Sequence, residues 1–159
     1  MLLAGEQPGA NFRGDCIVRI DALLDAGVRQ FIDLAAEHEG PGSYVPILFE
    51  RAAARRVRVA HRRHAMPDFG VPSAASMRAT LDVIYRAIGA GETLYLHCWG
   101  GVGRTGTVVG CLLREQGFDF AAALDVTARK WRVMEKRSRH PNSPETPKQI
   151  AFIERWPGV

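Results

Sequence analysis

The sequence predicts an α/β fold in which a central, mostly parallel sheet of about four to five strands is covered by helices on both faces. Short apolar runs that suit buried strands alternate with longer segments whose apolar residues recur at helical spacing. Three of the expected helices stop at a glycine, and no internal repeat or long polar linker divides the chain. We therefore expect a single domain over residues 1–159, which is long enough to bury a core without disulfides or metals.

The first half of the chain alternates between expected strands and helices. The helical spacing that begins at Asp15 stops at Gly27, and glycine is typical of the position after a helix. The sequence Gly-Pro-Gly at residues 40–42 breaks the chain before the second helix. The expected elements are a strand and turn in residues 1–13, a helix over 15–27, a strand over 28–34, a helix over 44–56 and a short strand over 57–61.

The second half of the chain begins with an expected loop over residues 64–72, because two prolines and a glycine leave little room for regular pairing. Ser73 can cap the following helix, whose apolar stripe runs to Gly89. A compact strand is expected over residues 93–97. The remaining helices are expected over residues 104–116, after the capping residue Asp119, and from about Thr146 onward.

The formal net charge of +4 comes from arginine, since the chain has eighteen arginines and three lysines. Basic side chains cluster in residues 55–64 and again in residues 129–140. Such clusters are most often solvated faces, although they also suit anionic partners in general. We expect no specific nucleic-acid partner.

The sequence also predicts a cellular compartment. No apolar run is long enough to span a bilayer, and the first residues lack the basic and apolar regions of a secretory signal. The three cysteines, Cys16, Cys98 and Cys111, are odd in number and irregularly spaced, so they do not suggest a disulfide framework. We therefore expect a reducing, cytoplasmic location.

The most informative stretch is residues 94–106, where an apolar strand delivers Cys98 into a glycine-rich turn and Arg104 then opens a helix. In a parallel α/β sheet, ligands bind at the carboxyl ends of strands, and Cys98 stands at such an end. Residues 101–106 also fit the G-x-G-x-x-G pattern of dinucleotide sites, but the acidic residue near the required distance, Asp125, falls in a helical pattern. A Walker loop fails as well, because arginine stands where its lysine would be. Neither alternative gives Cys98 a function.

We interpret the turn instead as a loop that binds a phosphoryl group. Glycines at Gly100, Gly101 and Gly103 allow backbone N–H groups to point inward and form an anion nest, and the expected helix adds its positive end. The planar guanidinium of Arg104 can hold two phosphoryl oxygens, and the same positive field favours the nucleophilic thiolate form of Cys98. The predicted phosphate-binding residues are Trp99, Gly100, Gly101, Val102, Gly103 and Arg104.

Residues 97–106, HCWGGVGRTG, resemble the H-C-x5-R-[ST] signature of the cysteine-based protein tyrosine phosphatases, and the short chain is similar to their dual-specificity branch. Residues 66–73, MPDFGVPS, resemble the general-acid loop of that family, and residues 143–149, SPETPKQ, resemble the segment that carries its water-positioning glutamine. These matches span residues 66–149. The resemblance implies a phosphotyrosine phosphatase-like fold and an enzyme that needs no metal and no cofactor.

The resemblance also implies catalytic roles. Asp68 would protonate the leaving oxygen when Cys98 attacks phosphorus, and it would then activate the water that hydrolyses the phosphocysteine. A loop able to close over the site would carry this acid. The alternative for Asp68 is a turn-forming role after Pro67. Arg104 would stabilise the charge of the transition state.

Two further side chains complete the predicted catalytic set. Thr105 can donate its hydroxyl to the Cys98 thiolate, or it can be an ordinary threonine of the first helical turn. Gln149 can position the water, or it can close a capping box with Thr146. We expect His97 to order the loop from behind without titrating in catalysis. We also expect Cys111 to face the core, without a regulatory disulfide to Cys98.

The sequence therefore predicts a protein-tyrosine or dual-specificity phosphatase that acts on phosphorylated proteins or peptides through a phosphocysteine intermediate. The alternative substrates are phosphoinositides or inositol phosphates, and RNA 5′-phosphates. Residues 99–102 contain no lysine or arginine, which relatives that act on lipids and inositols often carry there, so protein substrates are favoured. A catalytically silent phosphopeptide-binding module is the alternative from another class, although it could dispense with Cys98 or Asp68, and this chain has both.

Overall fold

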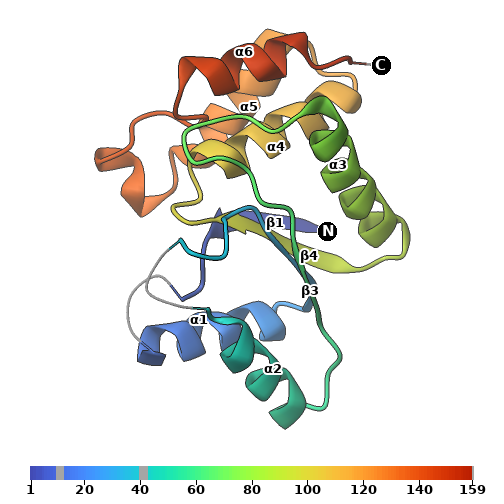
Figure 1. The fold of residues 1–159 in the computed structure, drawn as a ribbon, viewed down its shortest axis with the longest axis vertical. Coiled ribbons are helices and arrows are strands. Elements are labelled where there is room, and N and C mark those ends of the chain that lie inside the picture. Colours follow the sequence, from blue (N-terminus) through green and yellow to red (C-terminus); the bar gives the residue numbers. More distant parts are fainter. Residues whose placement is uncertain (10–12, 40–42, 159) are drawn as a thin grey trace.

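The computed structural model describes residues 1–9, 13–39 and 43–158, and it confirms the predicted α/β fold (Figure 1). Four strands form one parallel sheet in the order β1-β4-β2-β3, so β4 lies between β1 and β2. The strands are β1 (Leu2–Glu6), β2 (Val28–Asp33), β3 (Ala60–Arg63) and β4 (Thr93–Cys98). The helices are α1 (Arg13–Asp25), α2 (Val45–Ala54), α3 (Ala74–Gly89), α4 (Gly103–Glu115), α5 (Phe120–Trp131), the 3₁₀ helix η1 (Glu135–Ser138) and α6 (Pro147–Arg155).

Helices cover both faces of the sheet, with α1 and α2 on one side and α3 to α6 on the other (Figure 1). The central strand β4 divides its side chains between the two layers. Leu94 and Leu96 belong to the core shared with α3, α4 and α6, whereas Tyr95 packs against the core formed with α1 and α2. This alternation follows from the pleat of the strand, which turns successive side chains to opposite faces. The two cores therefore fix β4 from both sides.

The predicted helix ends are confirmed at several positions. Gly27 and Gly117, which follow α1 and α4, have positive φ angles of 83° and 89°. The side chains of Ser73 and Asp119 accept backbone N–H groups at the starts of α3 and α5. None of the described helices is both long and apolar enough to cross a membrane.

The short strand predicted over residues 57–61 lies further along the chain, as β3 at residues 60–63. Arg56 has a positive φ of 55°, and the N–H of Val57 donates to the Ala52 carbonyl at 3.0 Å, so the chain first turns off the end of α2. The alternation that begins at Val57 is therefore shifted, and pairing with β2 starts only at residue 60. The 3₁₀ helix η1 was not predicted. Residues 10–12 in the predicted first turn, and the predicted break at 40–42, lie outside the described residues.

Candidate active site

Cys98 is the last residue of the central strand, and the turn after it leads directly into α4. The residue is buried, with 3% of its surface exposed. The backbone N–H of Gly101 donates to the Cys98 sulfur at 3.2 Å. Because α4 begins at Gly103, the N–H groups of its first turn and its positive end face the same turn. This arrangement suits a bound anion above the sulfur.

Two glycines of the turn are required by close contacts. Gly101 has a positive φ of 75°, and a Cβ atom at this position would lie 2.5 Å from the carbonyl carbon of Gly5 in β1. At Gly103, a Cβ atom would lie 2.8 Å from Nε2 of Gln149 in α6. The turn therefore lies in tight contact with β1 and with the beginning of α6. A side chain at Gly101 would displace the turn, and a side chain at Gly103 would displace the amide of Gln149.

The guanidinium of Arg104 is buried and is held from one end by Glu39, in the segment that follows β2. Its two terminal nitrogens donate to the two carboxylate oxygens of Glu39 at 2.8 and 2.7 Å. Burial raises the pKa of Glu39, but the hydrogen bonds from Arg104, the backbone N–H of Ala36 and the nearby positive charge together outweigh burial and hold that pKa below its ordinary value. The sequence analysis missed Glu39. The sequence did carry a signal for it. Glu39 follows a buried parallel strand, and the residues that follow such strands lie at the same edge of the sheet as Cys98.

Asp68 lies in the predicted loop before α3, and it reaches the same arginine. One carboxylate oxygen of Asp68 is 3.0 Å from Nη2 of Arg104. The side chain is 56% exposed, which contrasts with the buried arginine. The next residue, Phe69, has a positive φ of 53° and is largely exposed. The structure thus brings the predicted acid to the predicted phosphate-binding arginine.

Gln149 ties the beginning of α6 to the loop that carries Asp68. Its Oε1 accepts the backbone N–H groups of Glu145 and Thr146, both at 3.1 Å, and the side chain of Thr146 accepts the N–H of Gln149. This is the capping box that the sequence indicated. In addition, Nε2 of Gln149 donates to the Gly70 carbonyl at 3.2 Å. The structural role of Gln149 is therefore observed, and its water-positioning role stays a prediction.

Thr105 occupies the first turn of α4 and is buried, with 3% of its surface exposed. Its hydroxyl has no hydrogen-bond partner within residues 1–9, 13–39 and 43–158. Leaving a buried hydroxyl without a partner costs free energy. Donation to the Cys98 sulfur remains the predicted role for it.

His97 lies behind the turn, fully buried between the sheet and α2. Its Nε2 lies 2.6 Å from the hydroxyl of Tyr44, and its Nδ1 lies 3.4 Å from the Cys98 carbonyl. Burial lowers the pKa of His97 to about 4, so the ring is neutral at physiological pH. The lowered pKa agrees with the expectation that His97 does not titrate in catalysis, and its role in ordering the loop stays a prediction.

A cavity of about 230 Å³ opens above Cys98. It brings together most of the predicted site residues, and Gly101 and Thr105 lie outside its lining. The residues that line it are Asp68, Phe69, Cys98, Trp99, Gly100, Val102, Gly103, Arg104, Lys136, His140, Glu145 and Gln149. The sequence analysis missed the wall formed by Lys136, His140 and Glu145, because nothing local connects this segment to Cys98.

Cys111 does not reach this cavity. It is fully buried in the core on the α3, α4 and α6 side, where burial raises the pKa of its thiol to about 12. Cys16, Cys98 and Cys111 all lie in the described residues, and none of them forms a disulfide bond there. Within the described residues, no group of three or more His, Cys, Asp or Glu side chains could hold a metal ion.

Residues 13–153 match a family model described as the DSP-PTPase phosphatase domain of Swiss Army Knife proteins. The match covers most of the chain and includes the turn, the acid loop and the start of α6. The chain belongs to this phosphatase domain family. The predicted relationship to the cysteine-based protein tyrosine phosphatases, and to their dual-specificity branch, is thereby confirmed.

Among curated proteins, the chain is similar to the 067L protein of Invertebrate iridescent virus 3, provisionally named a tyrosine phosphatase. The two are 26% identical over 156 residues, which cover 89% of this chain and 58% of the viral protein. The phosphatase domain described here thus spans a little over half the length of that relative.

Solved structures share the fold. The active form of Tk-PTP is 25% identical with a TM-score of 0.65, and the match covers 88% of this chain and 84% of that one. PTPMT1 in complex with PI(5)P is 18% identical with a TM-score of 0.68, and the match covers 98% of this chain and 89% of that one.

Proposed function

We propose that this phosphatase domain hydrolyses phosphomonoesters of proteins, on phosphotyrosine above all, through a phosphocysteine intermediate. The observation that carries the proposal is that Arg104 and Asp68 meet, 3.0 Å apart, in the cavity above Cys98. A thiol nucleophile, an anion clamp and a carboxyl group that can exchange protons with solvent are the groups that this reaction needs.

The reaction would proceed in two steps. In the first, the Cys98 sulfur attacks phosphorus and the phosphorus–oxygen bond of the ester breaks, while Asp68 gives its proton to the leaving oxygen. In the second, Asp68 takes a proton from a water that attacks phosphorus, the phosphorus–sulfur bond breaks, and the electron pair returns to sulfur. Free phosphate then leaves. The half-exposed position of Asp68 suits both transfers, since it can reach the ester and then water.

Glu39 would set the orientation of the arginine clamp. The carboxylate of Glu39 accepts one hydrogen bond from each terminal nitrogen of Arg104. The Nε side of the guanidinium therefore stays available to donate to the phosphoryl oxygens. The contact between Asp68 and Arg104 belongs to the state without substrate. A phosphoryl oxygen would replace the Asp68 oxygen on Nη2, and Asp68 would move to the leaving group.

Phosphoinositides or inositol phosphates remain the second candidate substrates, because two cationic or titratable side chains, Lys136 and His140, line the cavity opposite the acid loop. Both already have carboxylate partners, since Lys136 pairs with Glu6 and His140 contacts Glu145 at 3.0 Å. This neutralisation favours a substrate with one phosphoryl group over a substrate with several. The need for a reduced Cys98 supports a reducing compartment, and we propose the cytoplasm.

A direct test compares Cys98→Ser with Cys111→Ala on an aryl phosphate. The serine variant should lose hydrolysis and still bind inorganic phosphate, whereas the alanine variant should keep turnover because Cys111 lies outside the cavity. Retained turnover by Cys98→Ser would contradict the proposal. The wild-type kcat/KM values on phosphotyrosyl peptide, phosphoseryl peptide and inositol phosphate then rank the substrates, and a higher value on inositol phosphate would reverse the order proposed here.

A further inference from the structure

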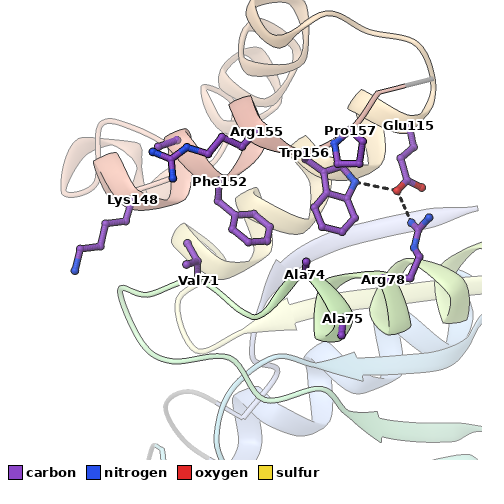
Figure 2. Close-up of a pocket in the computed structure, with 11 residues that line it drawn as sticks. Val71, Ala74, Ala75, Arg78, Glu115, Lys148, Phe152, Arg155, Trp156 and Pro157 are labelled. Carbon is purple, nitrogen blue, oxygen red and sulfur yellow. Dashed lines mark hydrogen bonds and ion pairs between the residues drawn. The ribbon is translucent and has the colours of Figure 1, made fainter.

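A second hollow, distinct from the catalytic cavity, lies between the beginning of α3 and one face of α6 (Figure 2). It has a volume of about 780 Å³, enough for one or two side chains of a bound peptide. Its surface is mainly apolar. Phe152 and Trp156 stack at 5.7 Å between ring centroids, and Val71, Ala74 and Ala75 face them. We call this hollow the α3–α6 groove.

One end of the α3–α6 groove is rigid and electrically balanced. The indole N–H of Trp156 donates to Oε1 of Glu115 at 2.8 Å, and the same carboxylate pairs with Arg78. The guanidinium carbon of Arg78 also lies 5.7 Å from the centre of the Trp156 ring. Arg78 is therefore already neutralised, and the aromatic wall is held in place before any ligand arrives (Figure 2).

The rim of the α3–α6 groove along α6 carries two cationic side chains. Lys148 and Arg155 are exposed, and neither has a carboxylate partner in the part of the chain that the structure describes. With Phe152 between them, they stand at positions i, i+4 and i+7, which lie on one face of a helix. Two cations thus stand at the rim of an apolar floor, and the chemistry that complements them is an acidic segment that also carries an apolar side chain.

The groove begins at the acid loop. Val71 follows Gly70, and Lys148 precedes Gln149, while Nε2 of Gln149 donates to the Gly70 carbonyl. Gln149 and Asp68 both line the catalytic cavity. The acid loop is therefore a wall shared by the cavity and the groove, and one polypeptide can reach from one to the other across it.

We propose that the α3–α6 groove docks an acidic, apolar segment of the phosphoprotein substrate while the phosphorylated residue occupies the catalytic cavity. The carboxylates of the segment pair with Lys148 and Arg155, and its apolar side chain packs on Phe152 and Trp156. Docking raises the local concentration of the phosphorylated residue at Cys98. This inference rests on the proposed protein phosphatase function and adds a specificity site to it.

The test uses two phosphotyrosyl peptides that differ only in a tag. One carries Glu-Leu-Phe-Glu and the other Gln-Leu-Phe-Gln, each joined to the phosphotyrosine by a flexible Gly/Ser linker and prepared with the tag on either side. The wild-type protein should give a higher kcat/KM on the acidic tag in one of the two orientations. The double variant Lys148→Glu/Arg155→Glu should lower that value about three- to tenfold, as expected for two exposed ion pairs, and leave the neutral tag and an aryl phosphate unchanged.

The matched control is Arg58→Glu/Arg86→Glu, which makes the same change in net charge at two exposed arginines near the ends where the strands begin. An equal loss in this control, or equal kcat/KM on the two tags for the wild-type protein in both orientations, would overturn the docking site. Failure of the proposed function is read separately, from the aryl phosphate. If the protein does not hydrolyse the aryl phosphate, NMR still tests the groove. The Cys98→Ser variant is titrated with the unphosphorylated acidic tag, and shifts of the amide signals of Val71 and Phe152 decide whether the groove binds the tag.

Discussion

The proposed phosphate-binding turn at residues 98–104 and the proposed acid loop at residues 64–72 both reach the same cavity, but the fold holds them in opposite ways. The turn is buried between β1, β4 and α6, and its arginine is 3% exposed. The acid loop is exposed at Asp68 and Phe69, and two hydrogen bonds from α6, to the carbonyls of residues 69 and 70, tie it down.

This difference separates two requirements of the reaction. A group that holds and attacks phosphorus must keep its position, and burial in tight contacts provides that. A group that gives a proton to one oxygen and takes one from another must move, and a half-exposed loop permits that. Substitutions in the turn should therefore affect activity and stability together, whereas substitutions at the tip of the acid loop should affect activity alone.

After Cys98→Ser, the largest effect on activity is expected from Asp68→Asn. Without a proton for the leaving oxygen, kcat should fall by about 10²- to 10⁴-fold on an alkyl or seryl phosphate, and far less on an aryl phosphate whose leaving group needs little protonation. The thermal unfolding temperature should not change, because the Asp68 side chain is 56% exposed. The control Asp125→Asn removes an equal charge from α5 and should change neither quantity. Equal losses on both classes of ester would mean that Asp68 is not the acid.

A comparison of Gly101→Ala with Gly100→Ala tests whether activity and stability change together in the turn. At Gly101 the new Cβ would meet the Gly5 backbone at 2.5 Å, in a conformation with φ of 75°. At Gly100 the nearest atom is a Val102 methyl at 3.5 Å. Displacing the turn by about 1 Å should lower kcat about 10²-fold, with about 2 kcal/mol of stability lost. Gly100→Ala should stay close to wild type in a chemical denaturation and in turnover. Similar behaviour of the two variants would contradict the packing described here.

Glu39→Gln should have a smaller effect on activity and a recognisable pH signature. A glutamine amide has only one acceptor oxygen, so it cannot accept hydrogen bonds from both terminal nitrogens of Arg104. We therefore expect kcat to fall about tenfold. Because the pKa of Glu39 is lowered in the folded protein, the ion pair stabilises the fold above the ordinary carboxyl pKa and is lost as the pH falls through the lowered value. The variant should thus unfold more easily than wild type at neutral pH, and the difference in stability should shrink as the pH falls through the lowered pKa of Glu39. A difference that is constant with pH would exclude this role.

The smallest effect is expected from the tie between Gln149 and the acid loop. Gln149→Leu removes the hydrogen bond to the Gly70 carbonyl together with the capping box, and Asp119→Ala removes only the cap of α5. Both variants should lose about 1 kcal/mol of stability by denaturation. Gln149→Leu alone should also lower kcat several-fold on esters with poor leaving groups. A loss that is the same for aryl and alkyl esters would instead favour the water-positioning role.

The sequence predicted the position of the turn between β4 and α4 well, because a strand, three glycines and a helix start are all local features. Asp68 was reached only through the resemblance, since nothing around Pro67 distinguishes an acid from a turn former. Glu39 was missed because its partner Arg104 stands 65 residues later, and only the parallel sheet brings the two together. The same holds for Lys136. The predicted start of β3 was wrong because the first residues of the alternating pattern follow the turn at Arg56 and do not pair with β2.

The central claim is that the Cys98 sulfur carries the phosphoryl group during turnover. Mass spectrometry of the acid-quenched protein, mixed with an aryl phosphate, measures this directly. We expect a phosphoryl adduct on the peptide that contains Cys98, more of it in Asp68→Asn, in which water is not activated, and none in Cys98→Ser. Turnover of the ester with no adduct on Cys98 in either the wild-type protein or Asp68→Asn, or with an adduct on another residue, would contradict the account.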